Sequence, residues 1–376
     1  MKYLVSDFYS DYECIGGECP ETCCGGWNIV IDEKSYEKYN DLQEPDRTWV
    51  LEKMEKTDGC YKMILDDNTG RCKFLNDEGW CLLYRNISPD MLCDTCKTFP
   101  RWAHIYYDLY VLTASIACPV VAKNIVNKKD PIQFRFMEDE EKINLSNPNW
   151  ERYNEVINGF VNTVDILQDR RFTIGTRLYL ALEVAREIQN CINSGNYSVL
   201  RTNIEPYCNY DNRLNIAKAF ATRINHIPNI HDFLNHIFDI IHIGAKKILL
   251  LNRIYTPNIK SADEFYEIKE QFNMNGRNDI EFENIAVQLV FEKYMGVIEG
   301  SKIYDQFLKI TIYVLILLTQ EMYMYKSGEL TEDNRVLLVS RLSRMMDHSD
   351  TFSIFRDDIL SGNSEDRIYD LLRLID

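Results

Sequence analysis

Cysteines constrain the fold of this chain more than any other feature, because ten of its twelve cysteines precede residue 120. Thiolates are soft anionic ligands that suit zinc or iron–sulfur clusters, and several must converge to hold an ion. The sequence therefore predicts a metal-binding N-terminal region. The spacing that carries this prediction is Cys14-x4-Cys19-x3-Cys23-Cys24, then Cys72-x8-Cys81, then Cys93-x2-Cys96, then Cys118-Pro119.

Cysteines also occur without a metal, either as buried free thiols or as disulfides. Free cysteine is among the most buried residue types, and we favour buried free thiols for Cys60, Cys191 and Cys208. A disulfide framework would require an oxidising compartment. The first residues show neither an apolar signal segment nor a small-residue cleavage site, so a cytoplasmic, reducing location is expected.

The composition changes after the cysteines, which predicts the domain organisation. Residues 1–125 are expected to form a small cysteine-rich metal-binding domain of short strands and tight turns, such as Asp66–Gly70. Residues 126–149 are polar and contain prolines, so we expect a linker or wrapped connection. Residues 150–376 are expected to form a larger all-helical domain. The predicted fold class is mainly α.

Helical periodicity supports the second domain. Apolar residues recur every three or four positions between Leu178 and Ile188, as on one face of a helix. Ser261-Ala-Asp-Glu264 is typical of a capping box, and Thr331 is a second plausible N-cap. The longest apolar run, Ile310–Leu318, is too short to span a bilayer and predicts a buried helix.

The charge of the chain limits its partners. The formal net charge is −16, and a surface this negative repels phosphate backbones and anionic lipids. Nucleic acid and membrane are therefore not expected as partners.

At the cysteines, the chain resembles the flagellin lysine-N-methylases. The resemblance is sharp from residue 14 to about residue 120, and over the helical remainder it rests on length and arrangement. The segment Cys72–Pro100 is also similar to a small zinc- or iron-chelating family built on CxxCxxCC. The motifs are Cys14-Ile-Gly-Gly-Glu-Cys-Pro-Glu-Thr-Cys-Cys-Gly-Gly-Trp-Asn-Ile29 with Asp32, Arg71-Cys-Lys-Phe-Leu75, Gly79-Trp-Cys-Leu82, Asp94-Thr-Cys-Lys-Thr-Phe-Pro-Arg101 and Cys118-Pro119.

The resemblance implies transfer of methyl groups from S-adenosylmethionine to lysine ε-amines of flagellin, the expected protein partner. It also implies an iron–sulfur cluster (4Fe-4S) or zinc as cofactor. Cys93 lies outside the family pattern, although the spacing Cys93-x2-Cys96 alone would still form a metal knuckle. Carried over position by position, the metal ligands would be Cys14, Cys19, Cys23, Cys24, Cys72, Cys81, Cys96 and Cys118.

The sequence does not identify the donor site or the catalytic residues. No Gly-rich turn of the dinucleotide-binding type is recognisable. Cys19-x3-Cys23 begins the CxxxCxxC pattern of radical chemistry, but Gly26 stands where its third cysteine would be. Arg101 and Trp102 are candidates for holding an anionic or sulfonium ligand, with a simple salt bridge from Arg101 as an equal alternative. A non-catalytic metal-binding interaction module and an iron–sulfur redox protein remain the alternative functions.

Overall fold

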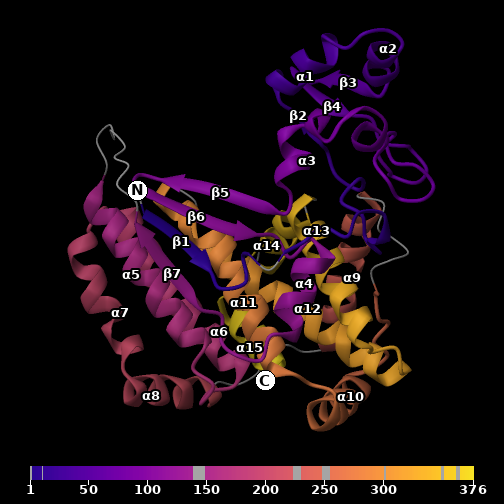
Figure 1. Ribbon diagram of the computed structural model, residues 1–376. Helices are drawn as coiled ribbons and strands as arrows, with labels where there is room; N and C mark the ends of the chain where they lie inside the picture. Colours follow the sequence, from indigo (N-terminus) through magenta and orange to yellow (C-terminus); the bar gives the residue numbers. More distant parts are fainter. Residues whose placement is uncertain are drawn as a thin grey trace.

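The computed structural model describes residues 2–10, 12–138, 149–222, 230–247, 255–299, 302–348, 351–360 and 365–376. Within these ranges, helices pack against a four-stranded sheet to form a large body, and a small lobe projects from it (Figure 1). Most of the described elements are helices, which confirms the mainly α class.

The sheet of the body has the strand order β5-β6-β1-β7. Strand β1 pairs in parallel with β6 and antiparallel with β7, while β5 and β6 form an antiparallel hairpin. The stretch 126–149, expected to be a linker or wrapped connection, contains β7 and so contributes a strand to this sheet. The strands are β1 (Lys2–Ser6), β5 (Arg101–Tyr106), β6 (Leu109–Ala114) and β7 (Phe134–Glu138).

Helix α12 (Ile303–Ser327) forms the centre of the body and includes the apolar run predicted to be buried. It is long and apolar enough to cross a membrane, but 94% of its most apolar window is buried within the protein, as in a core helix. Both predicted N-caps are confirmed, since the side chains of Ser261 and Thr331 accept bonds from the amides of Glu264 and Asn334. The other helices are α4 (Pro119–Asn127), α5 (Trp150–Leu167), α6 (Ile174–Ser194), α7 (Leu200–Cys208), α8 (Tyr210–Ala221), α9 (Ile230–Lys247), α10 (Ala262–Asn275), α11 (Asp279–Lys293), α13 (Glu332–His348), α14 (Thr351–Leu360) and α15 (Glu365–Ile375).

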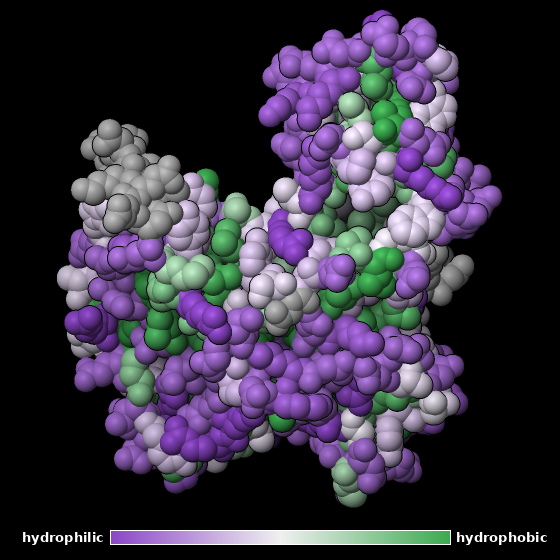
Figure 2. All heavy atoms as spheres, viewed as in Figure 1, coloured by the Kyte–Doolittle hydropathy of each residue, from purple (hydrophilic) through white to green (hydrophobic). Residues whose placement is uncertain are grey.

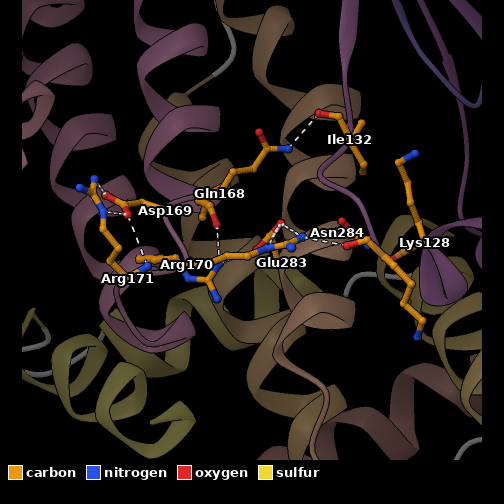
Figure 3. Close-up of polar contacts among 11 residues, drawn as sticks. Lys128, Ile132, Gln168, Asp169, Arg170, Arg171, Glu283 and Asn284 are labelled. Atoms are coloured by element: carbon orange, nitrogen blue, oxygen red, sulfur yellow. Dashed lines mark hydrogen bonds and ion pairs between the residues drawn. The ribbon is translucent and has the colours of Figure 1, made fainter.

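Polar residues of α11 bind the backbone before and after α4. Asn284 donates to the carbonyl oxygen of Lys128 at 2.7 Å, where α4 has ended (Figure 3). Gln288 donates to the carbonyl oxygen of Ala114 at 2.8 Å, at the end of β6. The Glu292 carboxylate accepts from the amide of Ile116 at 3.3 Å. These bonds satisfy backbone groups that would otherwise lack partners, so both ends of α4 are held against α11.

A buried ion pair joins α11 to the turn between α5 and α6. Glu283 is fully buried and accepts from Arg170 at 2.9 Å (Figure 3) and from Arg177 at 2.7 Å. Arg177 is itself only 2% exposed, so both of these charges depend on each other.

The small lobe has a core of its own, separate from that of the body. Tyr39 lies at its centre, fully buried, and its hydroxyl donates to the carbonyl oxygen of Met91 at 2.7 Å. The elements of the lobe are β2 (Val30–Ile31), α1 (Glu33–Asn40), α2 (Asp46–Leu51), β3 (Met54–Thr57), β4 (Cys60–Met63) and α3 (Asp94–Thr98), with the strand order β2-β4-β3.

The predicted turn Asp66–Gly70 is confirmed, because the amide of Gly70 donates to the carbonyl oxygen of Asp66 at 2.7 Å. The segment after this turn does not form a full strand. Only single bridges join Leu65 to Cys72 and Leu75 to Cys81. The body and the lobe both draw on the first 125 residues, since β1, β5, β6 and α4 lie in the body.

Candidate metal centre

Four of the predicted ligands lie where the lobe meets the body, around the phenol of Tyr12. Burial raises the pKa of this phenol, and so do the neighbouring thiols of Cys118, Cys14 and Cys23. Burial also raises the pKa of Cys19, with Cys118 and Cys14 again acting in the same direction. We group these four thiols, which act on Tyr12 or on one another, as the junction set: Cys14, Cys19, Cys23 and Cys118.

Arg344 of α13 holds the backbone on both sides of the junction set. Its guanidinium donates to the carbonyl oxygens of Thr22 at 3.0 Å and Glu21 at 3.3 Å, next to the first cysteines. It also donates at 3.3 Å to the carbonyl oxygen of Ala117, the residue before Cys118. One side chain therefore ties two cysteine segments, far apart in the sequence, to the helical body.

The charge on Arg344 is buried and largely balanced by Glu21. Arg344 is 4% exposed and Glu21 is 1% exposed. Arg341 shares the Glu21 carboxylate at 2.8 Å, whereas Arg344 lies 3.9 Å from it. Burial lowers the pKa of Arg344, opposed by Glu21 and by the thiols of Cys23 and Cys19. A cation in this position favours thiolate over thiol, which is the form that binds metal.

Five cysteines form a second group inside the lobe. The amide of Cys72 donates to the carbonyl oxygen of Cys24 at 2.8 Å, and Cys93 is fully buried, with its sulfur 3.8 Å from the carbonyl oxygen of Val30. All five pack in the core of the lobe. We call them the lobe set: Cys24, Cys72, Cys81, Cys93 and Cys96.

The two sets adjoin at Cys23 and Cys24, whose thiols hydrogen-bond to each other. The hydrogen bond from Cys23 lowers the pKa of Cys24 to about 7, with burial opposing it, and raises the pKa of Cys23 itself. In the lobe set, burial raises the pKa of Cys72 to about 12. Close backbone packing positions Cys24, since a Cβ on Gly25 would lie 2.6 Å from the carbonyl oxygen of Gly70.

All twelve cysteines are free thiols. The thiols of the two sets fit a thiolate-bound metal, because sulfur is a ligand that zinc and iron–sulfur clusters prefer and because the thiols of each set are neighbours. Within the described residues, no three cysteine, histidine or carboxylate side chains already converge as a metal-binding group. Metal binding by the eight predicted ligands therefore stays a prediction. The structure assigns four of them to each set and places Cys93 with the lobe set, as its spacing to Cys96 suggested.

The three cysteines predicted to be buried free thiols lie outside both sets. Cys191 is buried in α6, as predicted. The prediction was wrong for Cys60 and Cys208, which are exposed because they lie at the β3–β4 turn and at the end of α7.

Arg101 contacts the junction set through Tyr12. It donates to the carbonyl oxygen of Tyr12 at 3.0 Å, and its guanidinium carbon lies 4.5 Å from the centre of the Tyr12 ring. No ion pair of Arg101 occurs among the described residues, so the salt-bridge alternative is not supported there. Trp102 is 44% exposed.

Sequence reasoning missed the contribution of α13. Besides Arg344, this helix supplies His348, whose ring lies 4.8 Å from that of Trp27. The indole of Trp27 in turn donates to the carbonyl oxygen of Cys23 at 2.8 Å. No signal in the sequence connects α13 to the cysteines, because more than 200 residues separate this helix even from Cys118.

Comparison with known proteins places this geometry in context. Residues 161–374 match the family model described as the FliB lysine N-methylase C-terminal domain. The flagellar biosynthetic protein FliU of Salmonella muenchen is 29% identical over 130 residues, which cover 33% of this chain and 76% of that protein.

Two proteins named lysine-N-methylase, from Salmonella choleraesuis and Salmonella typhimurium, are also 29% identical over 130 residues. These residues cover 33% of this chain and only 32% of each of those proteins. No solved structure matches the chain.

Proposed function

The chain belongs to the FliB lysine-N-methylase family, and from that premise we propose that it transfers methyl groups from S-adenosylmethionine to lysine ε-amines of flagellin. The observation that carries this proposal is the family match over residues 161–374, together with relatives that are named lysine-N-methylases. Those relatives are matched over about a third of their length, so the donor and the substrate are both part of the proposal.

We place the reaction at the junction set. Cys14 is exposed, and Cys19 and Cys23 are only partly buried, so a substrate has access to this end of the cysteine region. In the lobe set no cysteine is fully exposed: Cys72 and Cys93 are buried and the other three are partly buried against the core of the lobe, which suits a structural role. An iron–sulfur cluster or zinc bound by these thiols would supply Lewis-acid or electron-transfer chemistry next to the substrate.

The protein residues around the junction set would position and desolvate the lysine. An amine attacks a methyl group only after it has lost its proton and is aligned with the donor. Because burial and neighbouring thiols raise the pKa of Tyr12, its phenol stays protonated near neutral pH. Tyr12 would therefore not be the base, and its phenol is hydrogen-bonded to the thiol of Cys14.

The direct test is methyl transfer with purified components. The protein is purified anaerobically, analysed for metal, and incubated with flagellin and S-adenosylmethionine carrying a labelled methyl group. We expect label on flagellin lysines, identified by mass spectrometry of its peptides. The variant Cys19→Ser should lose this activity, and the control Cys208→Ser, at an exposed thiol outside both sets, should keep it.

Failure of transfer would separate the alternatives. A metal-loaded protein that neither binds S-adenosylmethionine in calorimetry nor labels flagellin would be a non-catalytic metal module. A coloured protein with reversible electron transfer but no methyl transfer would be a redox protein.

A further inference from the structure

Strand β5 presents a free edge to solvent. It is the last strand of the sheet, and within the described ranges it pairs with β6 alone. The amide of Ser115 donates to the carbonyl oxygen of Pro100 at 2.9 Å. This bond identifies which residues of β5 direct their backbone groups toward β6. Alternate residues of an antiparallel strand direct their backbone groups toward and away from the partner. The groups that point away from β6 are those of Arg101, Ala103 and Ile105.

The outer face of the same sheet carries an apolar stripe. The register places Ile105 beside Tyr110, Tyr110 beside Tyr3, and Tyr3 beside Met137. The two tyrosine rings stack at 5.3 Å, while Ile105 is 51% exposed and Met137 is 48% exposed. Figure 2 shows apolar side chains gathered over these strands on the face turned toward the viewer. Exposed apolar surface that continues across several strands is typical of a protein-binding surface.

The free edge begins at the proposed reaction site. Arg101 is the first residue of β5 and donates to the carbonyl oxygen of Tyr12, whose phenol is hydrogen-bonded to the thiols of Cys14 and Cys118. From there, β5 runs across the top of the body, away from α3 and the lobe (Figure 1). A chain paired with β5 would therefore have one end beside the junction set.

We propose that an extended, lysine-bearing segment of the substrate protein pairs with the free edge of β5 and brings its lysine to the junction set. This inference rests on the proposed function and adds the mode of substrate binding. The backbone bonds of an added strand give affinity, and its alternate side chains meet the apolar stripe.

Charge distinguishes this occupant from a second copy of the chain. The net charge of −16 attracts a segment that contains lysine, whereas two copies would repel each other. Free edges that are not protected by charge or proline invite pairing with another chain, and after Arg101 the strand residues 102–106 contain no proline, lysine, arginine, aspartate or glutamate.

The test uses two substitutions at Ala103, which is exposed and directs its amide outward. Ala103→Pro removes this N–H and places a ring at the edge, but it leaves the ladder with β6 intact because proline is tolerated at such positions. Ala103→Val keeps the N–H and suits a strand. Flagellin binding is measured without donor, and KM and kcat are measured with it.

We expect Ala103→Pro to weaken flagellin binding and raise KM about ten-fold or more, with kcat nearly unchanged, from a lost hydrogen bond and the steric block. Ala103→Val should stay within about two-fold of the wild type, since its N–H remains. Circular dichroism and thermal unfolding check that both variants are folded. If the proline variant does not fold, Ile105→Lys replaces it, because a cation at this exposed position would repel a lysine-bearing segment.

The outcomes separate this inference from the function itself. A wild type that methylates flagellin while Ala103→Pro has the same KM overturns the binding mode and leaves the function standing. A wild-type dimer that the proline variant dissociates, with flagellin binding unchanged, shows that the edge pairs two copies and also overturns it. A wild type that neither binds nor methylates flagellin overturns the proposed substrate and this inference together.

Discussion

Replacing Arg344 by methionine tests whether this side chain holds the junction set in place. Methionine is unbranched and similar in length, so the substitution removes the charge and three hydrogen bonds while the space stays largely filled. Removing one partner of a buried ion pair costs about 3–5 kcal/mol, because the other charge is left unpaired. Glu21 would keep Arg341 at 2.8 Å, so we expect the lower end, about 3 kcal/mol.

The assay is urea unfolding followed by tryptophan fluorescence, combined with hydrogen exchange of the amides of residues 19–27. Trp27, one of five tryptophans, packs against His348 across this contact, so its share of the emission changes when lobe and body separate. Folded domains are stable by about 5–15 kcal/mol, so a loss of about 3 kcal/mol is readily measured. Exchange in this segment should accelerate together with the loss of stability.

The control is Arg356→Met. Its side chain is 35% exposed and pairs with Asp305 at 3.4 Å and Asp357 at 2.8 Å. Surface pairs of this kind contribute little to stability, because water and salt screen them. If Arg344→Met costs no more than Arg356→Met, and exchange in residues 19–27 is unchanged, Arg344 does not hold the cysteine segments in place.

Three further perturbations give expected outcomes of their own. Burial raises the pKa of the Glu292 carboxyl to about 7, so the folded protein binds a proton at this group more tightly than the unfolded chain does. The stability that this group contributes therefore declines as the pH rises from about 4.5 to about 7. The free energy of unfolding should fall by on the order of 2–3 kcal/mol across that pH range in the wild type and not in Glu292→Gln. The same pH dependence of stability in both proteins would contradict the role given to Glu292. Glu283→Gln leaves the buried Arg177 without a charged partner and should cost about 3–5 kcal/mol in urea unfolding; a loss below about 1 kcal/mol would show that the pair is dispensable. Cys72→Ser should reduce the amount of bound metal and make the lobe sensitive to protease, whereas Cys208→Ser should change neither. Equal metal content in the two variants would show that the lobe set does not bind metal.

The outward edge of β5 could not have been found from the sequence. Its residues are ordinary for a strand, and nothing local shows that β6, rather than β5, is the strand that pairs with β1. The same holds for β7, which lies in a stretch whose polar and proline-containing composition predicted a linker or wrapped connection. Strand pairing is a contact between distant segments, so local composition predicts it poorly.

The sequence alone determined the features that depend on near neighbours along the chain. Helical periodicity, the caps at Ser261 and Thr331, and the turn ending at Gly70 are set by hydrogen bonds within a few residues. The cysteine spacing and the resemblance it carries also needed no structure to be recognised. Only the tertiary structure decided which thiols share a neighbourhood, and it made the adjacent Cys23 and Cys24 the point where the two sets meet. The physical reason is that the path of the chain, fixed by burial and by charges such as Arg344, brings together groups that no local pattern connects.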